Sequence, residues 1–258
     1  MSRIIVITSG KGGVGKSSTT INLGYALASK KNRICLIDAD FGLKNLDVML
    51  GLENRVIYDL KDVIDNKCTL KQILVKNKRY ESLYLLPACK SLSFENINTE
   101  YMSQMIKQLK NEFDYIFIDS PAGIEKGFQY ASGISNEAII VVTLDVTSLR
   151  DADRVIGLLM KQGISEMHML VNKYNDEDIA KHRCLSLKDA YDILSIPLLG
   201  LIYDDQKMIE SINKGMPFYL DQSSTSQCFD RIAKRLEGQQ IPFQKNHKKP
   251  LFERIFGI

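Results

Sequence analysis

The stretch SGKGGVGKSS, residues 9–18, contains four glycines, two lysines and several hydroxyl residues. It follows an apolar run, RIIVIT at 3–8, and precedes a segment with helical spacing, SSTTINLGYALASK at 17–30. This order predicts a buried strand, a glycine loop and a helix. Gly10, Gly15, Lys16 and Ser17 satisfy the pattern G-x-x-x-x-G-K-[ST]. In this pattern, backbone N–H groups close around phosphate oxygens at a helix N-terminus.

This loop is interpreted as a binding site for ATP and Mg²⁺. Lys16 is expected to reach the β- and γ-phosphates, and the Ser17 hydroxyl is expected to ligate the metal ion. Glycines suit the loop because a Cβ would obstruct the close approach of phosphate and the positive φ values. The predicted nucleotide-binding residues of the loop are Gly10, Lys11, Gly12, Gly13, Val14, Gly15, Lys16, Ser17 and Ser18.

Short apolar runs recur along the chain and alternate with segments of helical spacing. Several lack the alternation of a half-exposed strand, which is typical of strands covered on both faces. The succession predicts an α/β fold with a doubly wound, mainly parallel sheet. The runs are RIIVIT (3–8), RICLID (33–38), SLYLLP (82–87), YIFIDS (115–120), AIIVVTL (138–144), MHMLVNK (167–173) and LLGLIY (198–203).

A phosphate loop of this kind is expected to work with an acid at the end of another apolar strand. FDYIFIDSPAG, residues 113–123, supplies that acid as Asp119. Asp119 is therefore the predicted acidic partner of the loop, beside the Mg²⁺ ligand Ser17.

Composition limits the other possibilities. The 258 residues are 45% hydrophobic and 25% charged, for which one large globular domain is the default. No apolar run approaches the roughly 18 residues that a spanning helix needs, so neither a signal peptide nor a transmembrane segment is expected. The cysteines are scattered without a CxxC pair, which favours free thiols in a reducing compartment. They are Cys35, Cys68, Cys89, Cys184 and Cys228.

Lys11 is a second lysine that an ordinary phosphate loop does not need. With it, KGGVGKS (11–17) resembles the deviant Walker A box of the MinD/ParA family of ATPases. The resemblance implies that Lys11 is catalytic together with Lys16 and reaches across an ATP-dependent homodimer to the partner's phosphates. A cation that arrives only on dimerisation would neutralise charge developing on the transferred phosphoryl group. The alternative is a solvated loop lysine.

The resemblance covers most of the chain and is most specific to the septum-placing branch of the family. Asp40 then corresponds to the catalytic aspartate that orients the attacking water, and Asp119 would hold Mg²⁺, in part through water. Asp38 could belong either with the water-orienting Asp40 or with the Mg²⁺-holding Asp119. The segments that carry the resemblance are IDADFGLKNLDVMLGLENRVIYDL (37–60), similar to switch I, DSPAGIE (119–125), similar to switch II, and SLRDADR (148–154), similar to the start of the partner-binding helix.

Two further pairs of site residues follow from the same resemblance. Asn172 in VNKYN and Asp205 in YDDQ are expected to contact adenine, although YDDQ lacks the proline that often precedes the acid in the family. Asp151 and Asp153 match the docking positions for a partner. A solvated acidic first turn, favoured by the helix dipole, is the alternative for this second pair.

The last residues, LFERIFGI at 251–258, predict a short amphipathic helix that binds a membrane. Residues 245–258 carry a side-chain charge of +3, and residues 1–244 are neutral with 30 basic and 30 acidic side chains. A basic linker before an apolar helical face is attracted to anionic lipids. The alternative is a helix that docks on the protein's own core. The predicted membrane residues are Leu251, Phe252, Ile255, Phe256 and Ile258.

The predicted organisation is an ATPase domain at 1–238, a flexible basic linker at 239–249 and a membrane-targeting helix at 250–258. By resemblance, the protein would position the division septum, with a MinC-type inhibitor as partner and a MinE-type activator where one is present. It would be cytoplasmic and peripheral on the inner face of the plasma membrane.

Three rival classes remain open. A flagellar-number regulator of the FlhG type would also carry an amphipathic helix, but such relatives usually have an additional N-terminal segment. A ParA-like DNA-segregation ATPase would need a basic face, and the neutral body argues against a specific nucleic-acid partner. An iron–sulfur carrier would need paired interface cysteines, which the scattered five do not offer.

Overall fold

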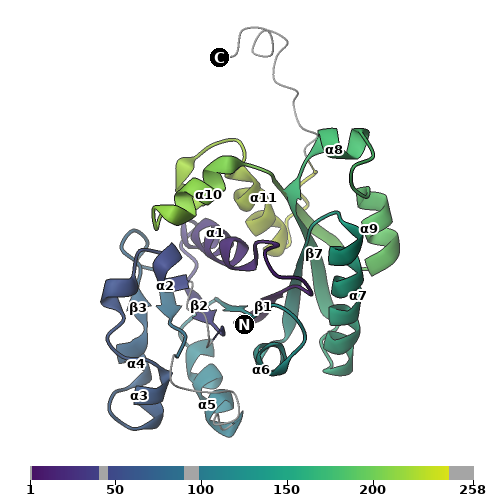
Figure 1. The fold of residues 1–258 in the computed structure, drawn as a ribbon. Coiled ribbons are helices and arrows are strands. Elements are labelled where there is room, and N and C mark those ends of the chain that lie inside the picture. The colour runs from purple at the N-terminus through teal and green to yellow at the C-terminus, as the bar shows by residue number, and fades with distance from the viewer. Residues whose placement is uncertain (1, 41–45, 90–98, 244–258) are drawn as a thin grey trace.

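The computed structural model describes residues 2–40, 46–89 and 99–243 of the chain. In these ranges it forms an eight-stranded sheet with the order β3-β4-β2-β5-β1-β6-β7-β8, covered by helices on both faces (Figure 1). All neighbouring strands are parallel except β3 and β4. The predicted doubly wound, mainly parallel sheet is thus confirmed.

Each of the seven predicted apolar runs forms a strand. The additional strand, β3, pairs antiparallel with β4 at the edge of the sheet and has only two residues. The strands are β1 (Arg3–Thr8), β2 (Ile34–Asp38), β3 (Val75–Lys76), β4 (Leu83–Leu86), β5 (Tyr115–Asp119), β6 (Glu137–Val142), β7 (Glu166–Tyr174) and β8 (Leu198–Tyr203).

The described helices divide between the two faces of the sheet. In Figure 1, α1, α10 and α11 lie on one side, and α5, α6, α7 and α9 lie on the other. The α-helices are α1 (Lys16–Ala28), α2 (Leu46–Met49), α3 (Leu60–Ile64), α4 (Leu70–Ile73), α5 (Thr99–Lys110), α6 (Lys126–Gly133), α7 (Val146–Lys161), α8 (Asp176–Ala180), α9 (Leu187–Leu194), α10 (Gln206–Asn213) and α11 (Gln227–Leu236), and the 3₁₀ turns are η1 (Glu53–Arg55) and η3 (Phe218–Asp221).

The central strands are buried on both faces because successive side chains enter different cores. In β1, Ile4 and Val6 pack into the core beneath α5, α6 and α7. Ile5 and Ile7 pack into the core beneath α1 and α11. This explains why β1 is apolar throughout and lacks polar alternation.

The register of the central strands brings the predicted site residues to one edge. Asp38 at the end of β2 pairs with Asp119 at the end of β5, and Asp119 also pairs with Ile7 near the end of β1. The glycine loop follows β1 directly. In parallel sheets the carboxyl ends of the strands meet at the same edge, which is where ligands bind in this class of fold.

The C-terminal region is described as far as residue 243. Arg235 of α11 donates to the carbonyls of Ile241 and Pro242 at 2.8 and 3.0 Å, and it lies 4.1 Å from the Phe243 ring centroid. Arg235 thus holds the first part of the predicted linker against the body. The predicted membrane helix at 250–258 lies outside the described residues, and no described helix is long and apolar enough to cross a membrane.

Candidate nucleotide site

The phosphate loop joins β1 to α1, and the start of this helix suits an anion. Gly15 is the N-cap of α1, and no side chain caps the first N–H groups of this helix. The first turn also contains no acidic residue. Uncapped N–H groups and the helix dipole together favour a negative ligand here.

Two glycines of the loop leave no room for a side chain. Gly15 has a φ of 97°, and a Cβ on it would lie 2.2 Å from Asn172 Nδ2. A Cβ on Gly10 would lie 2.4 Å from the backbone of Asp151. The loop therefore packs directly against the end of β7 and the start of α7.

Lys16 is buried beneath the loop. Its Nζ donates a hydrogen bond to Ser9 Oγ at 2.9 Å. Burial lowers the pKa of Lys16, while the nearby carboxylates of Asp119 and Asp40 act in the opposite direction. Because a hydroxyl does not compensate a buried ammonium charge, a phosphate oxygen is a suitable additional partner at this position.

Asp119 is buried beside Asp38 and the first turn of α1. Burial raises the pKa of Asp119 to about 7; hydrogen bonds from the Ser17 and Thr20 hydroxyls lower it, and the neighbouring Asp38 carboxylate raises it. Thr20 Oγ1 lies 3.3 Å from Asp119 Oδ1. Crowded carboxylates next to a hydroxyl form the oxygen-rich environment that Mg²⁺ prefers. Ser17 and Asp119 therefore fit the predicted metal site.

Asp38 binds both flanks of residues 41–45, inside the segment that is similar to switch I. Its Oδ1 accepts from the Asp40 N–H at 3.1 Å, and its Oδ2 accepts from the Leu46 N–H at 3.3 Å. Residues 41–45 between them lie outside the described ranges. Asp40 is half-buried and close enough to Lys16 to affect its pKa. The structure thus gives Asp38 an anchoring contact, and the catalytic role of Asp40 stays a prediction.

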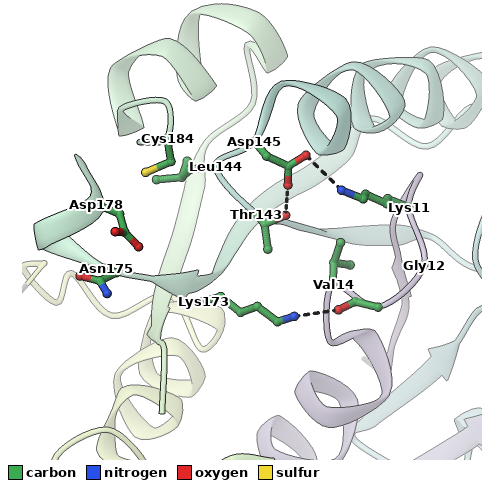
Figure 2. Close-up of a pocket in the computed structure, with 11 residues that line it drawn as sticks. Lys11, Gly12, Val14, Thr143, Leu144, Asp145, Lys173, Asn175, Asp178 and Cys184 are labelled. Atoms are coloured by element: carbon green, nitrogen blue, oxygen red, sulfur yellow. Dashed lines mark hydrogen bonds and ion pairs between the residues drawn. The ribbon is translucent and has the colours of Figure 1, made fainter. Parts of the chain in front are cut away.

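Lys11 is engaged outside the loop, at the start of α7. Its Nζ lies 3.2 Å from Asp145 Oδ1 (Figure 2) and 3.1 Å from Thr147 Oγ1. Burial alone would raise the pKa of Asp145, but hydrogen bonds from Thr143, Thr147, the Ser148 N–H and Lys11 hold it well below its usual range. Lys11, Thr143 and Asp145 line part of a cavity of about 430 Å³ beside the loop.

The two predicted adenine residues lie near the ends of the neighbouring strands β7 and β8 but have different local roles. Asn172 is buried, and its Nδ2 donates to the Val14 carbonyl at 2.7 Å. Asp205 is the N-cap of α10 and accepts from the Lys207 N–H at 3.0 Å. Their contact with a base stays a prediction.

The two predicted partner residues lie on the first half of α7. Asp153 is exposed, whereas Asp151 is half-buried and its backbone meets Gly10. The candidate docking face is therefore in direct contact with the phosphate loop through α7.

Several residues of the site were not predicted from the sequence. Ser9 binds Lys16, Thr147 and Asp145 bind Lys11, and Lys173 binds the loop at the Gly13 carbonyl. The sequence could have indicated Asp145, because an aspartate three residues before Ser148 suits a helix N-cap. In the structure the Asp145 side chain accepts from the Ser148 N–H.

Comparisons with known proteins place this site in a family. Residues 1–237 match the ParA family model, described as NUBPL iron-transfer P-loop NTPase. The septum site-determining protein MinD of Synechocystis is 51% identical over 245 residues, which is 94% of this chain and 92% of that protein. The chain belongs to the MinD/ParA family of P-loop ATPases.

Solved structures of family members agree with this assignment. The MinC:MinD cell division protein complex of Aquifex aeolicus has a TM-score of 0.88 at 44% identity, covering 95% of this chain and 99% of that one. The Pyrococcus horikoshii septum site-determining protein MinD complexed with Mg-ADP has a TM-score of 0.79 at 30% identity. The match covers 92% of this chain and 96% of that one. The predicted P-loop fold, ATPase activity and cofactors ATP and Mg²⁺ are confirmed at the level of the family.

The relatives also bear on the rival classes. The name shared by the Synechocystis and Pyrococcus relatives is septum site-determining protein, which supports the septum-placing branch over flagellar or DNA-segregation regulators. The family model's description mentions iron transfer, but Cys35 and Cys228 are buried. Burial raises the pKa of Cys35, and it raises that of Cys228 to about 12. Thiols held neutral in this way are poor metal ligands.

Proposed function

We propose that this family member is an ATP-controlled switch that places the division site from the membrane surface. It binds ATP with Mg²⁺, forms a homodimer around the nucleotide, binds the cytoplasmic face of the inner membrane and carries a MinC-type division inhibitor there. The observation that supports the proposal most is that the two loop lysines have different environments and different partners. Lys16 is buried beneath the loop, whereas Lys11 is engaged outside it.

The residues of the loop and the strand ends would carry out hydrolysis. Lys16 neutralises phosphate charge, and Ser17 and Asp119 hold Mg²⁺, in part through water. When bound, the metal ion polarises the phosphoryl oxygens. Asp40 orients the attacking water. Asp38, by binding both flanks of residues 41–45, keeps Asp40 near Lys16.

Asn172 and Asp205 would select the base. The Asn172 carboxamide donates to the loop through Nδ2, and its oxygen is the atom suited to accept from the adenine amino group. Asp205 offers a carboxylate just after the neighbouring strand β8, where it also caps α10.

Lys11 would connect nucleotide binding to dimerisation. Its ion pair with Asp145 is partly exposed, with side-chain exposures of 44% and 42%. Pairs of this kind contribute about 0–1 kcal/mol, so Lys11 can leave Asp145 at little cost and reach the partner's phosphates.

Lys11→Ala is therefore expected to separate binding from turnover. The affinity of the monomer for ATP should change by less than about fivefold, whereas hydrolysis should fall by about 10³-fold, as when a cation supplied in trans is removed. Titration calorimetry measures the affinity, phosphate release measures hydrolysis, and light scattering of the ATP-bound protein measures dimerisation. A loss of ATP affinity as large as that of a Lys16 variant would place Lys11 inside its own subunit's site instead.

The partner face would lie at the start of α7. Asp151 and Asp153 offer carboxylates to a MinC-type inhibitor, and the solved complex of the Aquifex MinD with its MinC supports a partner of this type. Because Asp151 touches Gly10 of the loop, this face is in contact with the nucleotide site. A MinE-type activator would act on the same dimer where one is present.

Membrane binding would reside in Leu251, Phe252, Ile255, Phe256 and Ile258. A helix of two turns gains little from each buried side chain, so a single tail binds marginally. Two tails on one dimer bind with an avidity that can exceed either one by about 10²–10⁴-fold. ATP, by forming the dimer, would therefore control residence on the membrane.

Sedimentation with vesicles of anionic phospholipid tests this function. The full chain should pellet with ATP and Mg²⁺ and remain in the supernatant with ADP and Mg²⁺. Vesicles of neutral phospholipid and a chain truncated after Lys249 serve as controls, and neither should pellet the protein. Equal sedimentation with the two nucleotides, or binding that survives the truncation, would contradict the proposal.

A further inference from the structure

The end of β7 departs from regular strand geometry next to the phosphate loop. Its pairing with β8 changes register between Val171 and Tyr174, and Lys173 has a φ of 55°. A regular strand would send Asn172 and Lys173 to opposite faces of the sheet. The irregularity instead lets both side chains reach the same loop. Left-handed backbone at a non-glycine residue is costly and clusters at functional sites.

The two side chains bind successive carbonyls of the loop. Lys173 Nζ donates to the Gly13 carbonyl at 3.1 Å (Figure 2), and Asn172 Nδ2 donates to the Val14 carbonyl at 2.7 Å. Both contacts are made by the protein with itself, across about 160 residues of sequence, so they can hold the loop before a nucleotide arrives.

A held carbonyl also fixes the N–H group of the same peptide. In a trans peptide the C=O and N–H bonds point in opposite directions. The Gly13 carbonyl belongs to the same peptide as the Val14 N–H, and the Val14 carbonyl to the same peptide as the Gly15 N–H. Gly13 and Gly15 have φ values of 74° and 97°, and glycine permits either orientation of the adjoining peptides.

We propose that Lys173 and Asn172 are positioning residues that turn the N–H groups of Val14 and Gly15 toward the phosphates. By holding the two carbonyls on the outer side of the loop, they preorganise the N–H groups that bind phosphate. The Lys173 ammonium group also polarises the Gly13–Val14 peptide, which strengthens its N–H as a donor. The proposal rests on the nucleotide site of the proposed function and on neither its membrane nor its partner role.

Lys173→Met tests the proposal, because methionine keeps the apolar stem and removes the donor. Hydrogen exchange of a peptide covering residues 9–18, measured without nucleotide, should become faster. The dissociation constants for ATP, ADP and inorganic triphosphate should all rise by about tenfold. Lys173→Arg, which restores a cationic donor, should bring all of these values back to within about threefold of the original protein. Lys161→Met, an exposed change at the end of α7, is the matched control and should alter none of them.

The alternatives give different results. Weaker ATP binding with unchanged triphosphate binding would mean that Lys173 contacts the base or ribose. Weaker triphosphate binding with unchanged hydrogen exchange would mean that it contacts phosphate directly. If Lys173→Arg bound nucleotide as weakly as Lys173→Met, the loss of the hydrogen-bond donor would not explain the loss of affinity. Each of these outcomes overturns the positioning role. Failure of the unchanged protein to bind triphosphate or ATP would instead overturn the nucleotide site itself.

Discussion

Lys16→Met should weaken the binding of both ATP and ADP by about 30-fold to several thousand-fold. Removing one partner of a buried, hydrogen-bonded charge pair costs about 2–5 kcal/mol, and each 1.4 kcal/mol is a factor of about ten in affinity. Lys16 is buried beside the loop with Ser9 Oγ as its hydrogen-bond acceptor, so its charge is directed to a phosphate that binds there. Titration calorimetry with each nucleotide measures the effect, and an affinity within threefold of the original would refute the assignment.

The same variant should not lose stability without nucleotide. Burial disfavours the Lys16 charge, as its lowered pKa indicates, so removing it should leave the melting temperature unchanged or higher. Asp119, whose pKa is about 7, can take up a proton once the ammonium group is absent. Lys188→Met, an exposed change on α9, is the control and should alter neither affinity nor melting temperature. A large drop in the melting temperature of Lys16→Met would mean that lost folding explains lost binding.

Phe252→Glu should reduce ATP-dependent binding to anionic vesicles by about 10²–10⁴-fold. Each tail loses the burial of one large apolar side chain, worth about 1.5–3 kcal/mol, and the loss counts twice in a dimer. The new carboxylate would also meet the negative surface of the vesicle. Partition between vesicles and supernatant, measured with ATP over a range of lipid concentrations, gives the change. Nucleotide binding and dimerisation should remain as in the original protein.

Tyr191→Glu provides the matched control for the tail. It makes a similar aromatic-to-acid change at a site on α9 that is 56% exposed, and it should leave vesicle binding unchanged. Thermal unfolding without lipid separates the two interpretations of the tail. If residues 250–258 packed on the protein's own core, Phe252→Glu would lower the melting temperature by several degrees, since a buried charge destabilises the fold.

The sequence by itself determined the local parts of the site. Gly15, Lys16 and Ser17 could be placed at a helix N-terminus because the motif, the preceding apolar strand and the following helical spacing lie within 30 residues. Asp119 could be placed at the same edge because parallel strands bring their carboxyl ends together. Strands buried on both faces have a strong apolar signal. β3, with two residues, is too short for any periodic signal and was missed.

Only the tertiary structure decided which of these groups touch. Lys11 and Asp145 are 134 residues apart, and their contact depends on how α7 packs against the loop. The contacts of Asn172 and Lys173 with the loop depend on a change in strand register and on one left-handed residue. Neither contact follows from residue type or spacing, because a shift of one position along a strand exchanges the face to which each side chain points. Local chemistry therefore identified the phosphate loop, and the packing of distant strands and helices determined what holds it.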